Sequence, residues 1–322
     1  MAKDIHRFSH SRISTFKQCP QKHHYAYVEQ IEVPESAATI PGKMFHECIA
    51  NVSRGLDITP IIKDFERLCT SGKLEFEPDL LEYLVSKYFQ YYKKEFDIEA
   101  PVLIEQEFTE KLDGDDYLTV IIDRAYIIGD TLTVRDTKTT QTKLKYTLDD
   151  VQFNQQLLLY LPYVENFIKM KVNAIQIDEV RLAKLKPVPL KANGKPSTDK
   201  KLLDLVTYED YYDELASRGL ETEKEYQPIL EFLKQRGHPL FNRITAQILD
   251  DNIVGSNAID FLNTYRVIKN LNKIYAKTNK APCYRVKGPL CKWCQYQELC
   301  QLDYTNPGIA SREIIIEKIS KT

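Results

Sequence analysis

The chain has 322 residues, 43% of them hydrophobic, and a formal net charge of −2 at pH 7. These values are typical of a globular protein with one large domain or two smaller ones, and they exclude a polycation, so any nucleic-acid binding must come from local basic clusters. No apolar run approaches the roughly 20 residues that span a bilayer, and the first residues lack the apolar stretch of a secretory signal. We therefore expect a cytoplasmic protein with no membrane partner.

The first part of the chain is predicted to be mainly helical. Residues 9–30 show apolar positions at helical spacing behind a capping serine, and Cys19-Pro20 interrupts this helix. Residues 42–96 continue the helical pattern with a break near Ser71-Gly72. Their last part is rich in Tyr and Phe, which at this density are expected to form core.

The periodicity then changes to that of strands. Residues 102–108, 117–123 and 131–138 are rich in β-forming residues and separated by turn residues, which predicts a three-stranded meander. Residues 149–170 return to a helical pattern, and residues 174–183 read as a further strand. This order of elements predicts an α/β fold.

Residues 200–280 are charged and are predicted to be helical. Together with a basic loop that begins at Lys184, they suggest a helical insertion or lid over 184–280, and the main domain would then comprise 1–183 and 281–322. A second basic cluster runs from Lys269 to Lys292. Each cluster is either a nucleic-acid contact or simply a solvated face.

Two carboxylates are predicted to face each other across the second hairpin. If Gly129-Asp130 is a two-residue turn, Asp123 lies opposite Asp136, and Lys138 points to the same face of the sheet. Like charges at such a position are unfavourable unless a divalent cation such as Mg²⁺ or Mn²⁺ lies between them. The alternative is a different register, with Asp123 in a surface ion pair with Arg124 or Arg135.

These residues resemble a known family. The pattern of Asp123 followed by Asp136-Thr137-Lys138 resembles the PD-(D/E)xK nuclease superfamily, and the flanking residues are similar to RecB-like nuclease domains. The resemblance implies a restriction-endonuclease-like core, with a mixed β-sheet flanked by helices. It further implies that Lys138 acts on the attacking water or on the transition-state charge.

Other motifs extend the resemblance. Gln156-Leu-Leu-Leu-Tyr160 resembles a helix motif that lies beside the active site of that group, where positions i and i+4 share one face. Gly42-Lys-Met-Phe-His46 is similar to an element whose histidine binds the metal. The family usually places a carboxylate on the first strand, for which Glu105 is the better match and Glu107 a substitute.

Four of the seven cysteines are candidate metal ligands. Cys291, Cys294 and Cys300 lie close together, and Cys19 lies almost a whole chain away. This spacing resembles that of the cysteines in iron–sulphur relatives of these nucleases, namely AddB-type subunits and CRISPR-associated adaptation nucleases. In those relatives four thiolates hold a 4Fe-4S cluster. The resemblance implies a clamp that joins the N- and C-terminal segments. A zinc site that uses a nearby ligand, drawn from His23, His24 and Cys283, is the alternative.

The resemblance implies a metal-dependent DNA exonuclease of recombination, repair or DNA processing, in a bacterial cell or a virus-infected host. Asp123, Asp136 and His46 would hold the metal, and Glu105, Gln156 and Tyr160 would support the metal or the DNA strand. Gly194-Lys195-Pro196-Ser197 is not a phosphate-binding loop, so the nuclease either acts alone or works with a separate helicase or recombination protein. Two alternatives remain: a catalytically silent nucleic-acid-binding or scaffold subunit and a zinc-binding interaction module.

Overall fold

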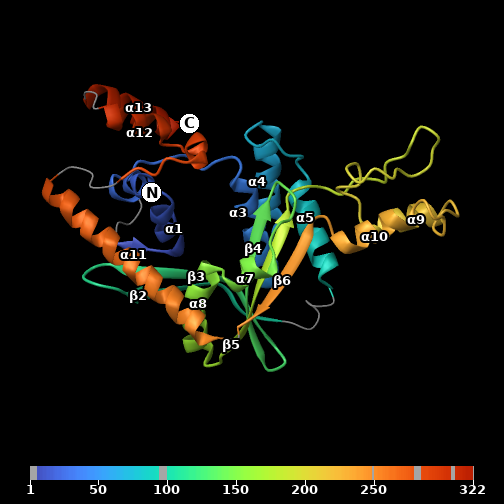
Figure 1. Ribbon diagram of the computed structural model, residues 1–322, viewed down its shortest axis with the longest axis horizontal. Coiled ribbons are helices and arrows are strands. Elements are labelled where there is room, and N and C mark those ends of the chain that lie inside the picture. The colour runs from blue at the N-terminus through green and yellow to red at the C-terminus, as the bar shows by residue number, and fades with distance from the viewer. Residues whose placement is uncertain (1–5, 94–99, 249, 279–283, 306–308, 322) are drawn as a thin grey trace.

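A mixed six-stranded sheet forms the centre of the computed structural model (Figure 1). The structure describes residues 6–93, 100–248, 250–278, 284–305 and 309–321. The central strand pairs antiparallel with strands on both sides, and a short N-terminal strand runs parallel to its beginning. The strands are β1 (Arg7–Phe8), β2 (Pro101–Lys111), β3 (Tyr117–Ile128), β4 (Thr131–Thr140), β5 (Val172–Arg181) and β6 (Phe241–Gln247).

The predicted meander is confirmed, and so is its turn. Ile128 pairs with Thr131 across a two-residue loop, in which Gly129 has φ +60°, a conformation that glycine adopts without strain. Strand β5 then joins β4 in parallel, after a crossover through helices, and β6 closes this side of the sheet antiparallel to β5. The acidic hairpin therefore lies in the middle of the sheet, where neighbouring strands hold both of its arms.

Two groups of helices pack on the sheet. The core cluster with α8 (Gln155–Ile168) and α11 (Asp251–Thr278) includes Val134 and Ile177 of the sheet. A second cluster joins Val180 and Phe241 to three helices before the meander. Those helices are α3 (Ile40–Ser53), α4 (Thr59–Thr70) and α5 (Leu80–Tyr91), and the short α7 (Leu148–Gln152) precedes α8.

The N-terminal helix is interrupted where the sequence predicted. Helix α1 (His10–Gln18) ends at Cys19, which is extended, and α2 (Pro20–His23) continues into the π-helix η1 (His24–Val28). The C-terminal segment folds onto η1 as η2 (Pro289–Trp293), α12 (Gln297–Thr305) and α13 (Ile309–Lys321). Figure 1 shows the first and last segments side by side.

The expectation that residues 200–280 are helical is wrong for β6. Helices α9 (Tyr208–Ala216) and α10 (Gln227–Arg236) agree with it, but Phe241–Gln247 forms a strand. Its side chains alternate between the two core clusters, with Phe241 in one and Ala246 in the other, so the strand is stabilised by tertiary packing on both faces.

The loop and helices before β6 have a hydrophobic cluster of their own, built around Leu203, Tyr211 and Leu233. The division of the chain at 184 and 280 stays a prediction. Within the described ranges, none of the helices combines the length and apolar character needed to cross a bilayer.

Candidate active site

Three carboxylates occupy one row across three strands. The pairs Ile104–Arg124 and Gln106–Ile122 flank Glu105 in the β2–β3 ladder and place it opposite Asp123. On the other side, the last pair of the β3–β4 ladder is Arg124–Arg135. The next position along β4 is Asp136, so the row runs from Glu105 through Asp123 to Asp136.

The backbone is irregular at this row. Glu105 has φ +47°, a left-handed conformation that costs a non-glycine residue on the order of 1–3 kcal/mol. Arg54 Nη2 donates to the preceding carbonyl, that of Ile104, at 2.7 Å, and so holds the backbone in place. A strained residue of this kind persists only where the surrounding structure holds it in place. Such residues cluster at functional sites.

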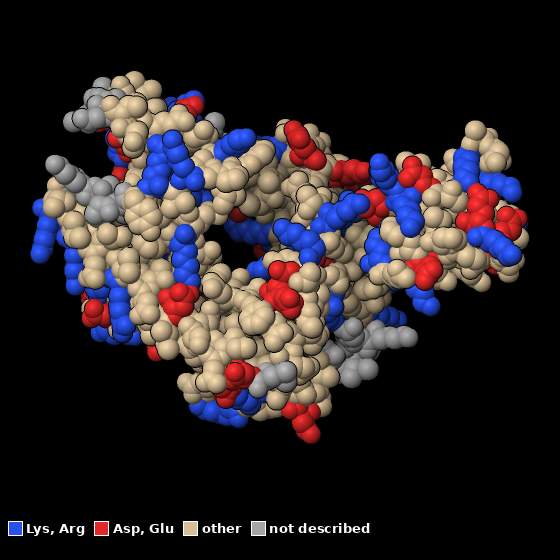
Figure 2. Space-filling model, viewed as in Figure 1, with Lys and Arg blue, Asp and Glu red and all other residues tan. Residues whose placement is uncertain are grey.

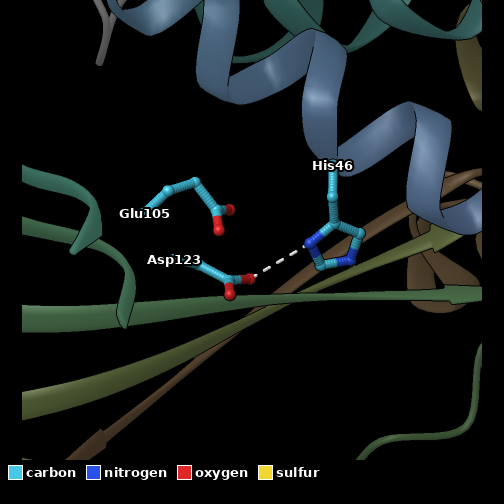
Figure 3. Close-up of side chains that lie close together, drawn as sticks. All are labelled: His46, Glu105 and Asp123. Atoms are coloured by element: carbon cyan, nitrogen blue, oxygen red, sulfur yellow. Dashed lines mark ion pairs between the residues drawn. The ribbon is translucent and has the colours of Figure 1, made fainter. Parts of the chain in front are cut away.

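Helix α3 brings His46 to this row. A Cβ at Gly42 would lie 2.3 Å from Thr139 Oγ1, so only glycine lets α3 approach β4 this closely. His46 is one helical turn further on the same face, and its Nδ1 lies 3.3 Å from Asp123 Oδ2. Ligand atoms of His46, Glu105 and Asp123 all lie within 4.8 Å of one another, and Figure 3 shows these side chains converging.

The carboxylates of this row disturb one another's ionisation. Burial, together with the charge of Asp123, raises the pKa of Glu105 to about 7 and that of Asp136 to about 6. Burial also opposes ionisation of Asp123, but the hydrogen bond and charge of His46 outweigh it and lower the pKa of Asp123. Burial by itself would lower the pKa of His46. The hydrogen bond to Asp123 and the charge of Asp123 outweigh burial and raise this pKa.

This donor set fits a hard divalent cation. Oxygen ligands with one imidazole suit Mg²⁺ or Mn²⁺, and a cation would offset the burial and the repulsion that together raise the two carboxyl pKa values. Among the described residues, His46, Glu105 and Asp123 form the close group, whereas Asp136 turns toward Lys138. Which of the carboxylates bind the metal stays a prediction.

Asp136, Lys138 and Gln156 form a closed triangle. Lys138 Nζ lies 2.8 Å from Asp136 Oδ2 and donates to Gln156 Oε1 at 2.9 Å, while Gln156 Nε2 donates to Asp136 Oδ1 at 3.2 Å. Tyr160 is buried one turn after Gln156, and burial with the nearby carboxylates raises its pKa. The structure thus brings the predicted site residues of β3, β4 and α8 together.

The sequence alternative of a surface ion pair is wrong. Arg124 is 2% exposed and Arg135 is 1% exposed. Arg124 Nη2 donates to Thr137 Oγ1 at 2.6 Å and lies 3.6 Å from Asp178, which is fully buried. The backbone N–H of Thr137 donates to Asp123 Oδ2 at 3.0 Å, so this buried network holds the Asp123 carboxylate in place.

Two further residues were not predicted. Glu179, buried on β5, accepts hydrogen bonds from the backbone N–H groups of Lys145 and Tyr146 and so fixes the loop after β4. His10 of α1 is near enough to Lys138 that burial and this positive charge lower its pKa to about 4. The only sequence signal for Glu179 is a charge within an apolar strand, and His10 gives none.

The four predicted cysteines line one cavity of about 330 Å³. Burial, with the neighbouring thiols, raises the pKa of Cys294 and Cys300. The alternative histidine ligands are engaged elsewhere: His23 Nε2 accepts from Arg12, and His24 Nε2 lies 3.2 Å from Glu29. Neither histidine is among the described residues that line the cavity. Cys283 lies outside the described residues.

The mixed sheet, its acidic row and the adjacent lysine define the class of protein: a nuclease that depends on a divalent metal. Residues 7–301 match the family model of the PD-(D/E)XK nuclease superfamily. The chain belongs to that superfamily, as the motifs predicted. No curated protein matches the chain significantly. The RecB-like assignment and the iron–sulphur cluster stay predictions.

Proposed function

We propose that this protein is a metal-dependent deoxyribonuclease that works as an exonuclease in DNA recombination, repair or processing. The observation that carries the proposal is the row of three carboxylates, with His46 on one side and Lys138 on the other. A folding requirement alone gives no reason to gather these charges at a strained backbone position. DNA supplies the phosphodiester that such a site acts on.

Each side chain has a defined task in this proposal. His46, Glu105 and Asp123 would hold a Mg²⁺ or Mn²⁺ ion, with Asp136 beside them; when bound, such an ion would lower the pKa of its water and offset charge on the phosphate. Burial opposes the charge of Lys138, but Asp136 raises its pKa, so the lysine is protonated at neutral pH. In this charged state Lys138 would donate hydrogen bonds to the water or to the phosphate oxygens.

Gln156 keeps Lys138 in place for this task. Its carbonyl accepts from the ammonium group, and its amide donates to Asp136. The side chain therefore links the lysine to the carboxylate and limits the rotamers of both. Tyr160 is buried and forms a side-chain hydrogen bond with Gln156, so it supports the position of this residue.

Cleavage of end-labelled DNA with Mg²⁺ or Mn²⁺ tests the nuclease proposal. We expect Asp136→Asn to abolish cleavage and a chelator to do the same for the wild type. Asp130→Asn is the matched control, because Asp130 belongs to the same hairpin but lies exposed in its turn. Equal cleavage by Asp136→Asn, or cleavage that survives the chelator, would contradict the proposal.

We also propose that Cys19, Cys291, Cys294 and Cys300 hold a 4Fe-4S cluster. The support is that thiols from both ends of the chain line one cavity, and thiolates are the ligands that iron–sulphur clusters use. The cluster would tie the N-terminal helices to the C-terminal segment, a structural role. Iron and acid-labile sulphide in equal amounts would support this assignment, and a colourless protein that carries zinc would oppose it.

A motor for strand separation would come from a partner. The Gly194-Lys195 sequence lacks the earlier glycine and the following hydroxyl residue that a phosphate-binding loop requires. A helicase or recombination protein is the partner that we propose. Co-purification of a nucleotide-hydrolysing protein, and faster digestion of duplex DNA in its presence, would test this pairing.

A further inference from the structure

A polar cavity of about 920 Å³ lies beside strand β6. The ends of α5 and α10 and the strands β4, β5 and β6 contribute to its lining, and Figure 1 shows these elements next to one another. None of the proposed active-site side chains is among the described residues that line it. Arg135 of β4 does line it, whereas Asp136, the next residue, points to the opposite face of the strand and contacts Gln156. The cavity is therefore a site of its own.

The cavity has a positive lining. Its charged side chains are those of Arg135, Arg236 and Arg243, and no Asp or Glu is found among the described residues that line it. The neighbouring arm, formed by α9 and α10, carries Lys and Arg atoms mixed with Asp and Glu atoms on the surface that Figure 2 shows. The lining therefore has one sign of charge, whereas the surface beside it has both.

The buried network behind the cavity contains more positive than negative groups. Arg243 contacts both carboxylate oxygens of Asp178, with Nη2 at 2.7 Å from Oδ2, and Arg124 Nη2 lies 3.6 Å from the same oxygen. Arg135 is buried, and its charge also acts on Asp178. One carboxylate is thus shared by three guanidinium groups. Because a surplus of buried charge is unfavourable, an anion in the cavity would stabilise this network.

Hydrogen bonds fix the polar groups of the cavity. Arg135 pairs with Gln176, and Gln176 pairs with Thr245, in one row across β4, β5 and β6. Arg135 Nε donates to Gln176 Oε1 at 2.7 Å, and Gln176 Nε2 donates to Thr245 Oγ1 at 3.0 Å. Tyr92 also lines the cavity and is 5% exposed, yet its hydroxyl has no hydrogen-bond partner in the described part of the chain. This hydroxyl is a donor for a bound ligand.

Aromatic rings line another part of the cavity. His238 stacks on Phe241 with ring centroids 4.9 Å apart, and the ring of Tyr91 lies 4.5 Å from that of His238. Tyr91 is 50% exposed, so its ring is open to a ligand. Burial and the charge of Arg236 lower the pKa of His238 to about 4, and Asp210 opposes them only in part. The imidazole is therefore neutral at pH 7, and these rings form a surface on which a base can stack.

We propose that this cavity binds a nucleoside monophosphate, with the phosphate on the arginines and the base against the rings. Arginine binds phosphate oxygens in bidentate geometry, and bases stack on aromatic side chains. The volume lies within the range of small-molecule sites, about 300–1,000 Å³. The choice of a nucleotide rests on the proposed nuclease function, because a nuclease that works from an end releases nucleotides. A free nucleotide and the phosphorylated end of a strand offer the same chemistry.

Calorimetric titration of the full-length protein tests the site without any cleavage. Deoxyadenosine monophosphate, deoxyadenosine and inorganic phosphate are each added in the presence of EDTA, which keeps metal out of the active site. We expect the nucleotide to bind at least about 10-fold more tightly than either fragment, because each fragment makes only one of the two contacts. No binding of the nucleotide, or equally tight binding of phosphate, would overturn the inference. If such a protein still cleaves DNA, the nuclease proposal is unaffected.

A carboxylate placed in the cavity should block it. Thr245 lines the cavity and is exposed on β6, so Thr245→Glu should fold and present a negative charge to the arginines. We expect it to weaken nucleotide binding by at least about 10-fold. Gln247→Glu is the matched control, because Gln247 is exposed on the same face of β6, two residues further on, and does not line the cavity. Equal affinities of the two variants for the nucleotide would overturn the inference.

Replacement of Tyr91 tests the contact with the base. Because this side chain is half exposed, Tyr91→Ala should fold. It should lower the affinity for deoxyadenosine monophosphate by about 5- to 100-fold, as expected for the loss of one stacking contact, and leave that for inorganic phosphate unchanged. An unchanged affinity for the nucleotide would overturn the assignment of the rings to the base.

Competition with single strands separates the two sources of the ligand. A strand with a terminal phosphate and the same strand without it are each added to the protein loaded with deoxyadenosine monophosphate, again with EDTA. Displacement by the phosphorylated strand alone would assign the cavity to strand ends, and displacement by neither would assign it to the free nucleotide. Equal displacement by both strands would overturn the inference, because the terminal phosphate would then play no part.

Discussion

Replacement of Gly42 by alanine tests how α3 is held against the sheet. The new Cβ would lie 2.3 Å from Thr139 Oγ1, well inside contact distance, but 3.4 Å from Thr139 Cβ. Overpacking of this kind costs about 1–3 kcal/mol, whereas alanine is better than glycine inside a helix by about 1 kcal/mol. We therefore expect Gly42→Ala to lower the free energy of unfolding by up to about 2 kcal/mol.

The sign of the effect should reverse in a Thr139→Ala background. The offending oxygen is then absent, and the helix-propensity gain of about 1 kcal/mol remains. Urea unfolding of the four proteins gives the coupling energy, which we expect to be about 2 kcal/mol. Gly42→Ala should also weaken Mn²⁺ binding, because His46 moves with the helix. Additive effects of the two substitutions would refute this account of the contact.

Three further predictions concern the carboxylate row, the lysine and the thiols. Folding raises the pKa of Glu105 from 4.5 to about 7. The unfolded chain therefore loses this proton first, and the free energy of unfolding of the wild type falls as the pH rises from 4.5 to 7. Glu105→Gln should therefore raise metal-free stability relative to wild type at pH 8 but not at pH 4.5, and equal differences at both pH values in urea unfolding would contradict this. Gln156→Ala should lower kcat about 10- to 100-fold with little change in stability, since Lys138 loses an acceptor; an unchanged kcat in steady-state kinetics would contradict it. If the four thiols hold the proposed cluster, Cys294→Ser should lose its iron, whereas Cys69→Ser, outside the cavity, should retain it; equal iron in both purified variants would contradict the proposed cluster.

Local signals in the sequence were enough to predict the centre of the fold. The Gly129-Asp130 turn determines the register of its hairpin, and that register places Asp123 and Asp136 in one row. The i, i+4 spacing of Gln156 and Tyr160 likewise depends only on helix geometry. Such features follow from a few neighbouring residues, so they can be derived before the tertiary structure is known.

The remaining features depend on tertiary contacts. Strand β6 has no strong pattern of its own, and its Phe241 and Ala246 are stabilised by helices far away in the sequence. The burial of Arg124 is not predicted from the sequence, because its buried partner, Asp178, lies 54 residues further along the chain. The left-handed backbone of Glu105 likewise becomes visible only in the folded chain.

The position of a bound Mn²⁺ ion is the decisive test of the proposed metal site. A crystal grown with Mn²⁺ would locate the ion by its anomalous signal, independently of any activity assay. We predict a peak in contact with the imidazole of His46 and the carboxylates of Glu105 and Asp123. A peak elsewhere, or none at an Mn²⁺ concentration that supports DNA cleavage, would contradict the assignment of this site.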